Sequence, residues 1–160
     1  MNDRPLEKDY IQHLMIQMVD RFVVLPSKTY DAIREIVLLG SVLDKEHYRT
    51  LLNRFLNELK SEIVPNTNLL QGLIRLVERA PPFYLRADDL AKILRAIRYH
   101  LRDAALQDTE YTIHLTVAIF KVLTIMVECR VKNLNREEEH EPLLEILSKL
   151  RKHMDPLVRY

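Results

Sequence analysis

The stretch EYTIHLTVAIFKVLTIMVECR, which runs from Glu110 to Arg130, is the most apolar part of the chain. The segments on either side of it are shorter and amphipathic, with apolar residues at helical spacing. An amphipathic helix buries its apolar stripe against another apolar surface, and this stretch can supply that surface. We therefore expect Glu110–Arg130 to form a core helix that is buried nearly all round.

The same stretch is long enough to be tested as a membrane span. A span requires about 20 predominantly apolar residues with few charges. Lys121 lies in the middle of the stretch and His114 near its start. Because a charge at the bilayer centre costs at least a few kcal/mol, the sequence favours a core helix over a span. The charged N-terminus, MNDRPLEKDY, also lacks the apolar region of a secretory signal.

The composition is typical of a soluble all-helical protein. Of the 160 residues, 48% are hydrophobic and 29% are charged, as expected for one globular domain over residues 1–160. Only two glycines, Gly40 and Gly72, are present, whereas the tight turns of β-rich folds need glycine at positive φ. The sequence therefore predicts an all-α fold of about seven helices.

Net charge and cysteine content limit the partners and the compartment. The formal net charge is +1, so no overall field attracts nucleic acid or an anionic membrane. The single cysteine, Cys129, cannot form an intrachain disulfide, which suits a reducing compartment such as the cytoplasm. We expect Cys129, at the end of an apolar helix, to be a buried structural thiol.

Prolines and capping residues divide the chain into helices. Asp44 is a good N-cap, Asn66 or Thr67 can cap the fourth helix, and Thr109 can cap the apolar one. Pro142 fits a helix only in its first turn, so the last helix should begin nearer Glu141 than Glu137. The predicted helices cover about 5–24, 28–39, 45–63, a fourth that Pro81-Pro82 ends, 88–105, 110–130 and 137–153.

A leucine pattern recurs along the chain. Leu43, Leu85 and Leu134 each precede a pair of apolar residues by eight to ten positions, and the intervals between them are 42 and 49 residues. These intervals lie in or near the period of HEAT and armadillo repeats, about 40 to 47 residues. We predict antiparallel helix pairs (second with third, fourth with fifth, sixth with seventh) stacked as a superhelical repeat. A non-repetitive helical bundle is the alternative. The three apolar pairs are Leu51-Leu52, Ile93-Leu94 and Leu143-Leu144.

A basic stripe on the fifth helix is the candidate interaction face. Its cations recur at steps of three and four residues, so they share one side of a helix, with an aromatic residue among them. Such a stripe can bind phosphates or an acidic partner, although a solvated helix face is the simpler explanation, because the chain as a whole lacks a basic excess. Its members are Lys92, Arg95, Arg98, Tyr99 and Arg102.

No pattern for catalysis, a metal or a cofactor is present in the sequence. His140 lies among carboxylates, but one histidine with exposed glutamates is a poor zinc site, and acidic residues are favoured at a helix N-terminus. Cys129 has no neighbouring residue that singles out a base. The chain has no glycine-rich loop, which excludes a P-loop and a dinucleotide fingerprint. We therefore predict a protein that is not an enzyme.

Three stretches of the chain resemble one known family. They are RPLEKDYIQHL (Arg4–Leu14), LLQGLIRLVERAPPFYLRADDL (Leu69–Leu90) and VKNLNREEEHEPLLEILSKLRKHMDP (Val131–Pro156). The more specific pieces are Gln71-Gly72-Leu73, Ala80-Pro81-Pro82 and His140-Glu141-Pro142-Leu143. Together these stretches resemble the armadillo-like helical repeat region of large fungal signal-transduction NTPases. In those STAND-type proteins this region precedes a NACHT-like P-loop ATPase and a repeat sensor.

The resemblance implies a scaffold or regulatory module in signal transduction. The sequence continues only to Tyr160, so the ATPase is not part of it and we expect a partial module. The last helical layer of such a stack then needs a cover, which we expect to be a partner protein or a second copy of the chain. The alternative function is a small phosphate- or nucleic-acid-binding domain that uses the basic stripe.

Overall fold

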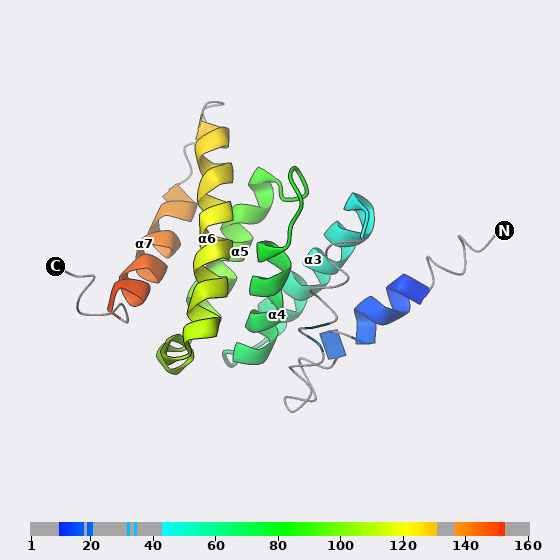
Figure 1. Cartoon of the computed structure of the whole chain (residues 1–160), viewed down its shortest axis with the longest axis horizontal. Coiled ribbons are helices and arrows are strands. Elements are labelled where there is room, and N and C mark those ends of the chain that lie inside the picture. Colours follow the sequence, from blue (N-terminus) through cyan, green and yellow to red (C-terminus); the bar gives the residue numbers. More distant parts are fainter. Residues whose placement is uncertain are drawn as a thin grey trace.

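A computed structural model describes residues 10–17, 19–20, 32, 34, 43–130 and 137–152 (Figure 1). Every regular element in these ranges is helical, which confirms the all-α prediction. The helices follow one another from the N-terminal side of the molecule to the C-terminal side. They are α3 (Lys45–Ser61), α4 (Thr67–Glu78), α5 (Ala87–His100), the 3₁₀ helix η2 (Asp103–Gln107), α6 (Thr109–Arg130) and α7 (Glu137–Lys152).

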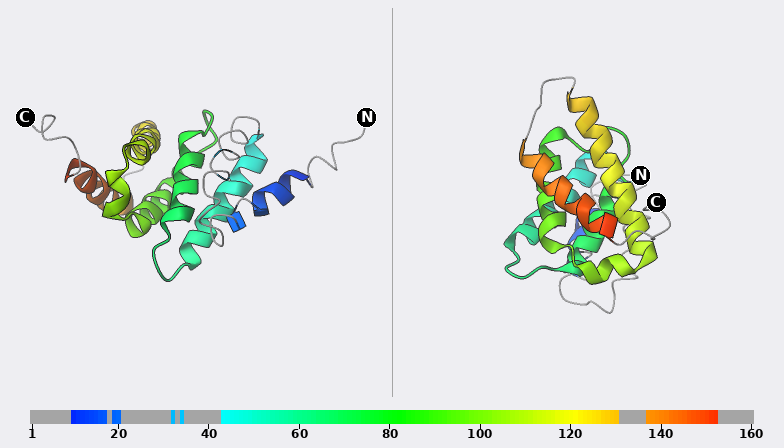
Figure 2. Two further views of the ribbon diagram at one scale, coloured as in Figure 1. Left: turned by 60° about the horizontal axis from the view of Figure 1, so that its bottom comes forward. Right: turned by 90° about the vertical axis from the view of Figure 1, so that its left-hand side faces the viewer.

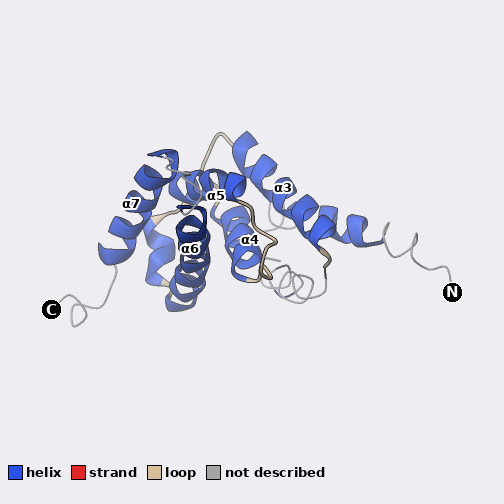
Figure 3. Cartoon of the chain, turned by 90° about the horizontal axis from the view of Figure 1, so that it is seen from above, coloured by secondary structure: helices blue, strands red, loops and turns tan. Residues whose placement is uncertain are grey.

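The helices form two layers (Figure 3). Helices α3, α5 and α7 make one layer, and α4 and α6 make the other. The main contacts are α4 with α6 and α5 with α7, while α3 packs on both α4 and α5. This alternation of layers is the arrangement predicted for a stack of helix pairs. Two predicted pairs are not the main contacts, since α4 packs mainly on α6 rather than on α5, and α7 packs mainly on α5 rather than on α6.

Two predicted helix starts are confirmed by their side-chain caps. A carboxylate oxygen of Asp44 accepts a hydrogen bond from the His47 amide (2.8 Å) at the start of α3. The amide oxygen of Asn66 accepts one from the Leu69 amide (3.0 Å) at the start of α4. Each bond satisfies one of the N–H groups that a first helical turn leaves without a partner.

Three predicted boundaries are wrong. Helix α5 ends at His100 rather than near 105, because the chain turns extended at Leu101 and continues as η2. The cap of α6 is Asp108, whose carboxylate accepts from the Glu110 amide, and Thr109 is already helical. Helix α7 begins at Glu137, so Pro142 lies inside the helix and beyond its first turn.

Part of the prediction concerns residues outside the described ranges. Residues 10–17 and 19–20 are helical, in agreement with the predicted first helix, as are residues 32 and 34 within the second. The remainder of those two helices, and the connector with Leu134, lie outside the described residues. So do the side chains of Cys129 and His140.

The core is one continuous apolar cluster that supports most of the repeat pattern. The anchors Leu43 and Leu85 are buried, and so are both members of the pairs Leu51-Leu52 and Ile93-Leu94. The third pair departs from the pattern. Leu143 is buried but Leu144 is 66% exposed, because α7 turns only one side toward α5.

Helix α6 is not buried nearly all round, and the prediction is wrong on this point. Its buried side carries Tyr111, Leu115, Ala118, Ile119 and Val122, and this side packs on α4 and α5. The opposite side is exposed, and its Phe120 side chain is 70% accessible. In the described part of the chain, Thr109–Glu128 is long and apolar enough to cross a membrane by length and composition.

Polar side chains connect neighbouring repeats. The Tyr84 hydroxyl donates to the Leu43 carbonyl, and Lys121 Nζ donates to the Ala80 carbonyl, each over a separation of 41 residues. Across the described helices such bonds span 28 to 48 residues, and most of them, from 34 upward, are close to one repeat period. The acceptor carbonyl groups lie at helix ends and in connectors, where they have no partner within their own helix. Side chains of the neighbouring repeat supply the missing hydrogen-bond donors.

One buried ion pair joins α3 to α5. The Arg49 guanidinium donates two hydrogen bonds to the Asp89 carboxylate (2.7 and 3.0 Å) and a third to the Tyr84 carbonyl. The Asp89 carboxylate also accepts from the Arg86 amide (2.8 Å), which caps α5. Its side chain is 3% exposed, so these partners replace the water that burial removes.

Two buried tyrosines make a test of the core, because their hydroxyl groups differ in hydrogen bonding. The Tyr48 hydroxyl donates to the Leu76 carbonyl (2.6 Å) at the end of α4. The Tyr111 hydroxyl is buried without a hydrogen-bond partner among the described residues. Burial raises the pKa of both phenols above the usual range, so both hydroxyls stay protonated.

We expect Tyr48→Phe to lower the free energy of unfolding by about 1–2 kcal/mol, because it removes the hydrogen bond to the carbonyl. Tyr111→Phe removes an unsatisfied hydroxyl, so it should leave stability unchanged or raise it by about 1 kcal/mol. Urea denaturation of both variants measures the two changes. Equal losses in the two variants would contradict the hydrogen bonding described.

Candidate interaction surface

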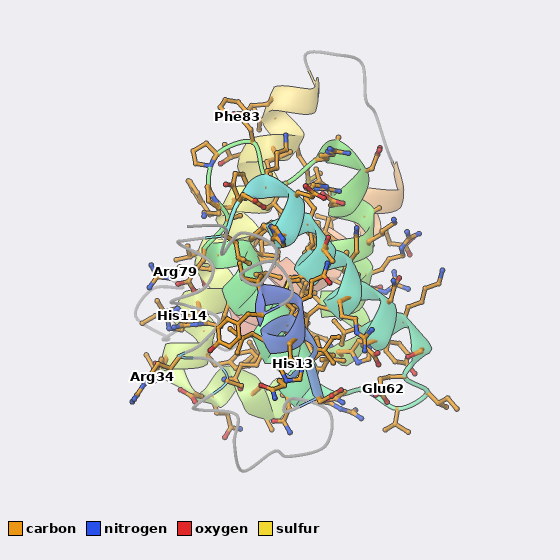
Figure 4. All side chains as sticks on the ribbon, turned by 90° about the vertical axis from the view of Figure 1, so that its right-hand side faces the viewer. His13, Arg34, Glu62, Arg79, Phe83 and His114 are labelled. Atoms are coloured by element: carbon orange, nitrogen blue, oxygen red, sulfur yellow. The ribbon has the colours of Figure 1, made fainter. Side chains whose placement is uncertain are left out.

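A groove lies between α3 and α5, on the layer that these helices share with α7. Its volume is about 520 Å³. Glu62, which follows α3, marks one end of it, and Figure 4 shows this residue on the opposite side of the molecule from His114 of α6. The groove therefore opens away from the α4 and α6 layer. Its lining residues are Asn53, Leu56, Asn57, Leu59, Lys60, Glu62, Lys92, Arg95, Ala96, Tyr99 and His100.

Each wall of the groove is one helical stripe. Asn53, Asn57 and Lys60 recur along α3 at steps of four and three residues, and all three are exposed. Lys92 and Arg95 lie on α5 and are also exposed. Residues at this spacing share one side of a helix. Because both stripes line the groove, the polar side of α3 and that of α5 face each other across it.

The floor of the groove contains a neutral histidine. The Asn66 amide donates to His100 Nδ1 (2.8 Å), so this nitrogen carries no proton. His100 Nε2 donates to the Leu59 carbonyl (3.0 Å). Burial lowers the pKa of the imidazole, and the amide facing Nδ1 opposes protonation further. Because both ring nitrogens have backbone partners, His100 joins the end of α3 to the start of α4.

Tyr99 forms the rim beside this histidine. Its hydroxyl donates to the Ile63 carbonyl (2.6 Å), and its ring meets the His100 ring edge-on at a centroid distance of 4.9 Å. The ring is half exposed at the groove. Tyr99 is thus held in place by a backbone bond and still offers an aromatic surface to a bound molecule.

Of the five residues of the predicted interaction face, three line the groove and two lie outside it. Lys92, Arg95 and Tyr99 line the groove. Arg98 Nε lies 3.4 Å from a Glu145 carboxylate oxygen, so it faces α7 instead. Arg102 is exposed at the start of η2, outside the groove lining.

The wall of the groove that α3 supplies was not predicted from the sequence. Asn53, Asn57 and Lys60 are polar residues at one-sided spacing on a predicted helix, and this signal is visible in the sequence. What the sequence does not show is that α3 and α5 are neighbours. Only the pairing of the two helices makes the stripes into one groove.

Among the described residues, no group of three or more His, Cys, Asp or Glu side chains could hold a metal ion. His114 Nδ1 is within hydrogen-bond distance of a Glu78 carboxylate oxygen, which ties α6 to α4. Both ring nitrogens of His100, the histidine that lines the groove, are hydrogen-bonded to the backbone, so neither is available to a ligand. The other polar side chains of the groove suit reversible binding.

Comparison with known proteins identifies one similarity. A family model described as ARM-like repeat matches residues 2–160. No curated protein and no solved structure matches the chain.

The neutral state of His100 makes stability depend on pH. Because its pKa is lowered by folding, the unfolded chain binds more protons than the folded chain between the two pKa values. We therefore expect the free energy of unfolding to fall as pH drops below about 6.5, the ordinary histidine pKa. Denaturant unfolding as a function of pH measures this, and His100→Gln should lower the slope. An identical slope in the variant would assign the pH dependence to other groups.

Proposed function

Because the chain belongs to the ARM-like repeat family, we propose that it is a non-enzymatic helical-repeat scaffold that binds a partner protein in the groove between α3 and α5. The observation that carries the proposal is the groove itself, with two polar walls and a floor that combines apolar side chains with the buried His100. Stacked helix pairs create extended surfaces that suit the binding of another chain.

The lining residues favour an acidic segment. Three cations, Lys60, Lys92 and Arg95, stand against one carboxylate, that of Glu62, while His100 is neutral. A negatively charged ligand is therefore attracted to the groove although the whole chain carries a net charge of only +1.

The α3 wall favours an extended peptide backbone. The side-chain amides of Asn53 and Asn57 can each donate and accept hydrogen bonds, as a peptide group does. From residue 53 to residue 60 the helix rises by about 10 Å, which matches about three extended residues. The proposed ligand is therefore a short, extended, acidic segment of a partner protein.

Charge reversal in the groove tests this proposal against a matched control. The probe is a fluorescein-labelled peptide of alternating glutamate and alanine, and its binding is followed by fluorescence anisotropy. We expect the double variant Lys92→Glu with Arg95→Glu to weaken binding by about tenfold or more, since both cations line the groove. The control, Arg98→Glu with Arg102→Glu, changes the net charge equally at one residue of α5 and one residue shortly after its end, both outside the groove lining, and should weaken binding by less than about threefold.

Two outcomes would oppose the proposal. Equal losses in the two double variants would show that overall charge, not the groove, controls binding. Tighter binding to generic single-stranded RNA or DNA than to the peptide, with a strong salt dependence, would support the phosphate-binding alternative for the five-residue basic stripe. Circular dichroism of each variant confirms that the helices remain folded.

We also propose a regulatory role in signal transduction within the cytoplasm. The support is the resemblance of three stretches to the helical region of fungal STAND-type NTPases and the single cysteine of the chain. Sequencing of full-length transcripts tests the association. A reading frame that continues into a P-loop ATPase supports it, and a frame joined to an unrelated enzyme opposes it.

A further inference from the structure

The exposed side of α6 is an uncharged apolar stripe. Its residues are separated by alternating steps of four and three, the spacing of a helix–helix seam. Between Glu110 and Glu128 no exposed residue of α6 is charged, since Lys121 is partly buried and bonded to the Ala80 carbonyl. We call this surface the α6 face, and it consists of Ile113, Val117, Phe120, Thr124 and Val127.

The threonines on and beside this face do not make it polar. Thr124 Oγ1 donates to the Phe120 carbonyl (2.9 Å), and Thr116 Oγ1 donates to the Thr112 carbonyl (2.7 Å). Each hydroxyl is thus satisfied within the helix and presents a methyl group as well. Covering the face with another apolar surface therefore leaves no hydroxyl donor without a partner.

The α6 face lies at one end of the two-layer stack. In the described part of the chain, α6 is the last helix of its layer and α7 the last of the other, and Figure 2 shows both at the front when that end faces the viewer. Leu144 and Leu147 of α7 are exposed as well. Internal repeats bury such residues against a neighbouring repeat, and no described helix covers these side chains.

We propose that the α6 face pairs with the α6 face of a second copy of this chain, in antiparallel orientation about a twofold axis at Phe120. The self-complementary spacing supports a twofold pair. Ile113, seven residues before the axis, then lies opposite Val127, seven residues after it. Phe120 meets its own counterpart at the centre.

Charge favours the antiparallel orientation. A parallel pair in register would set Glu110 beside Glu110 and Glu128 beside Glu128, which repel each other. In the antiparallel pair the helix position opposite Glu110 is that of Arg130. The acidic residues at both ends of the face also oppose binding to an anionic membrane surface.

The available area is sufficient for a reversible dimer. With a rise of 1.5 Å per residue and a width of about 10 Å, one side of α6 covers about 330 Å² and one side of α7 about 240 Å². The pair therefore needs the exposed side of α7 as well as the α6 face to bury about 600 Å² per partner. Stable interfaces bury about 600 to 1,000 Å² per partner, so this one is near the lower limit. We therefore expect a dimer that dissociates on dilution through the micromolar range.

Sedimentation of the full chain from low to high micromolar concentration tests the pairing. We expect wild type to shift from monomer to dimer, and Phe120→Asp to raise the dissociation constant by about a hundredfold or more, because two like charges meet at the axis. The matched control is Ile63→Asp, which places the same charge at an apolar side chain that is 88% exposed near the groove. It should dimerise as wild type does.

Cysteine crosslinking tests the orientation in a Cys129→Ser background. A disulfide requires Cα atoms within about 7 Å, so Phe120→Cys should oxidise to a covalent dimer. Ile113→Cys alone should not, whereas a mixture of Ile113→Cys and Val127→Cys chains should form the mixed dimer. Efficient crosslinking of Ile113→Cys to itself would overturn the antiparallel arrangement.

Three other results would overturn the proposal. Wild type that stays monomeric at high micromolar concentration excludes the pair. Dimerisation that is equal in Phe120→Asp and wild type places the interface elsewhere. Flotation of monomeric wild type with phosphatidylcholine vesicles, lost in Phe120→Asp, would assign the α6 face to a membrane surface instead. Far-ultraviolet circular dichroism and thermal unfolding confirm that Phe120→Asp is folded, as expected for an exposed position.

Discussion

The arrangement of the helices depends on the buried ion pair between Arg49 and Asp89. Most of the polar atoms of the pair form hydrogen bonds, because Arg49 also donates to the Tyr84 carbonyl and Asp89 also accepts from the Arg86 amide. One guanidinium thereby fixes α3, the connector before α5 and the first turn of α5. A buried pair adds little net stability over apolar residues of similar size, but removal of one partner leaves a buried charge. We interpret the pair as a constraint on the register of the two helices.

The groove exists because α3 and α5 are joined at both ends of their contact. Arg49 and Asp89 hold one end, and His100, bonded to the Leu59 carbonyl and the Asn66 amide, holds the other. Between these two points the polar stripes face each other without a direct bond across the lining. The groove and the α6 face belong to opposite layers, as the positions of Glu62 and His114 in Figure 4 indicate. A bound segment and a second copy can therefore occupy the protein together.

Polar bonds link neighbouring repeats of the stack. The carbonyl groups of Leu43, Leu59, Ala80 and Leu101 each accept a hydrogen bond from a side chain of a following repeat. A repeat taken alone would leave these acceptors to solvent, and its apolar side would stay uncovered. At the end formed by α6 and α7, no following repeat is described, and six of the twelve exposed large apolar side chains of the described residues lie on these two helices.

The sequence by itself determined the all-α class and the start of α3 at Asp44, and it limited the start of α4 to Asn66 or Thr67, because these depend on composition and local caps. Only the tertiary structure decided which side of α6 is buried. That helix is apolar on every side, so its sequence contains no preferred direction, and packing on α4 selects Leu115 and Ile119 while leaving Phe120 exposed. The ion pair and the groove were beyond sequence reasoning for a related reason. Their residues are about 40 positions apart, and only the folded stack brings them together.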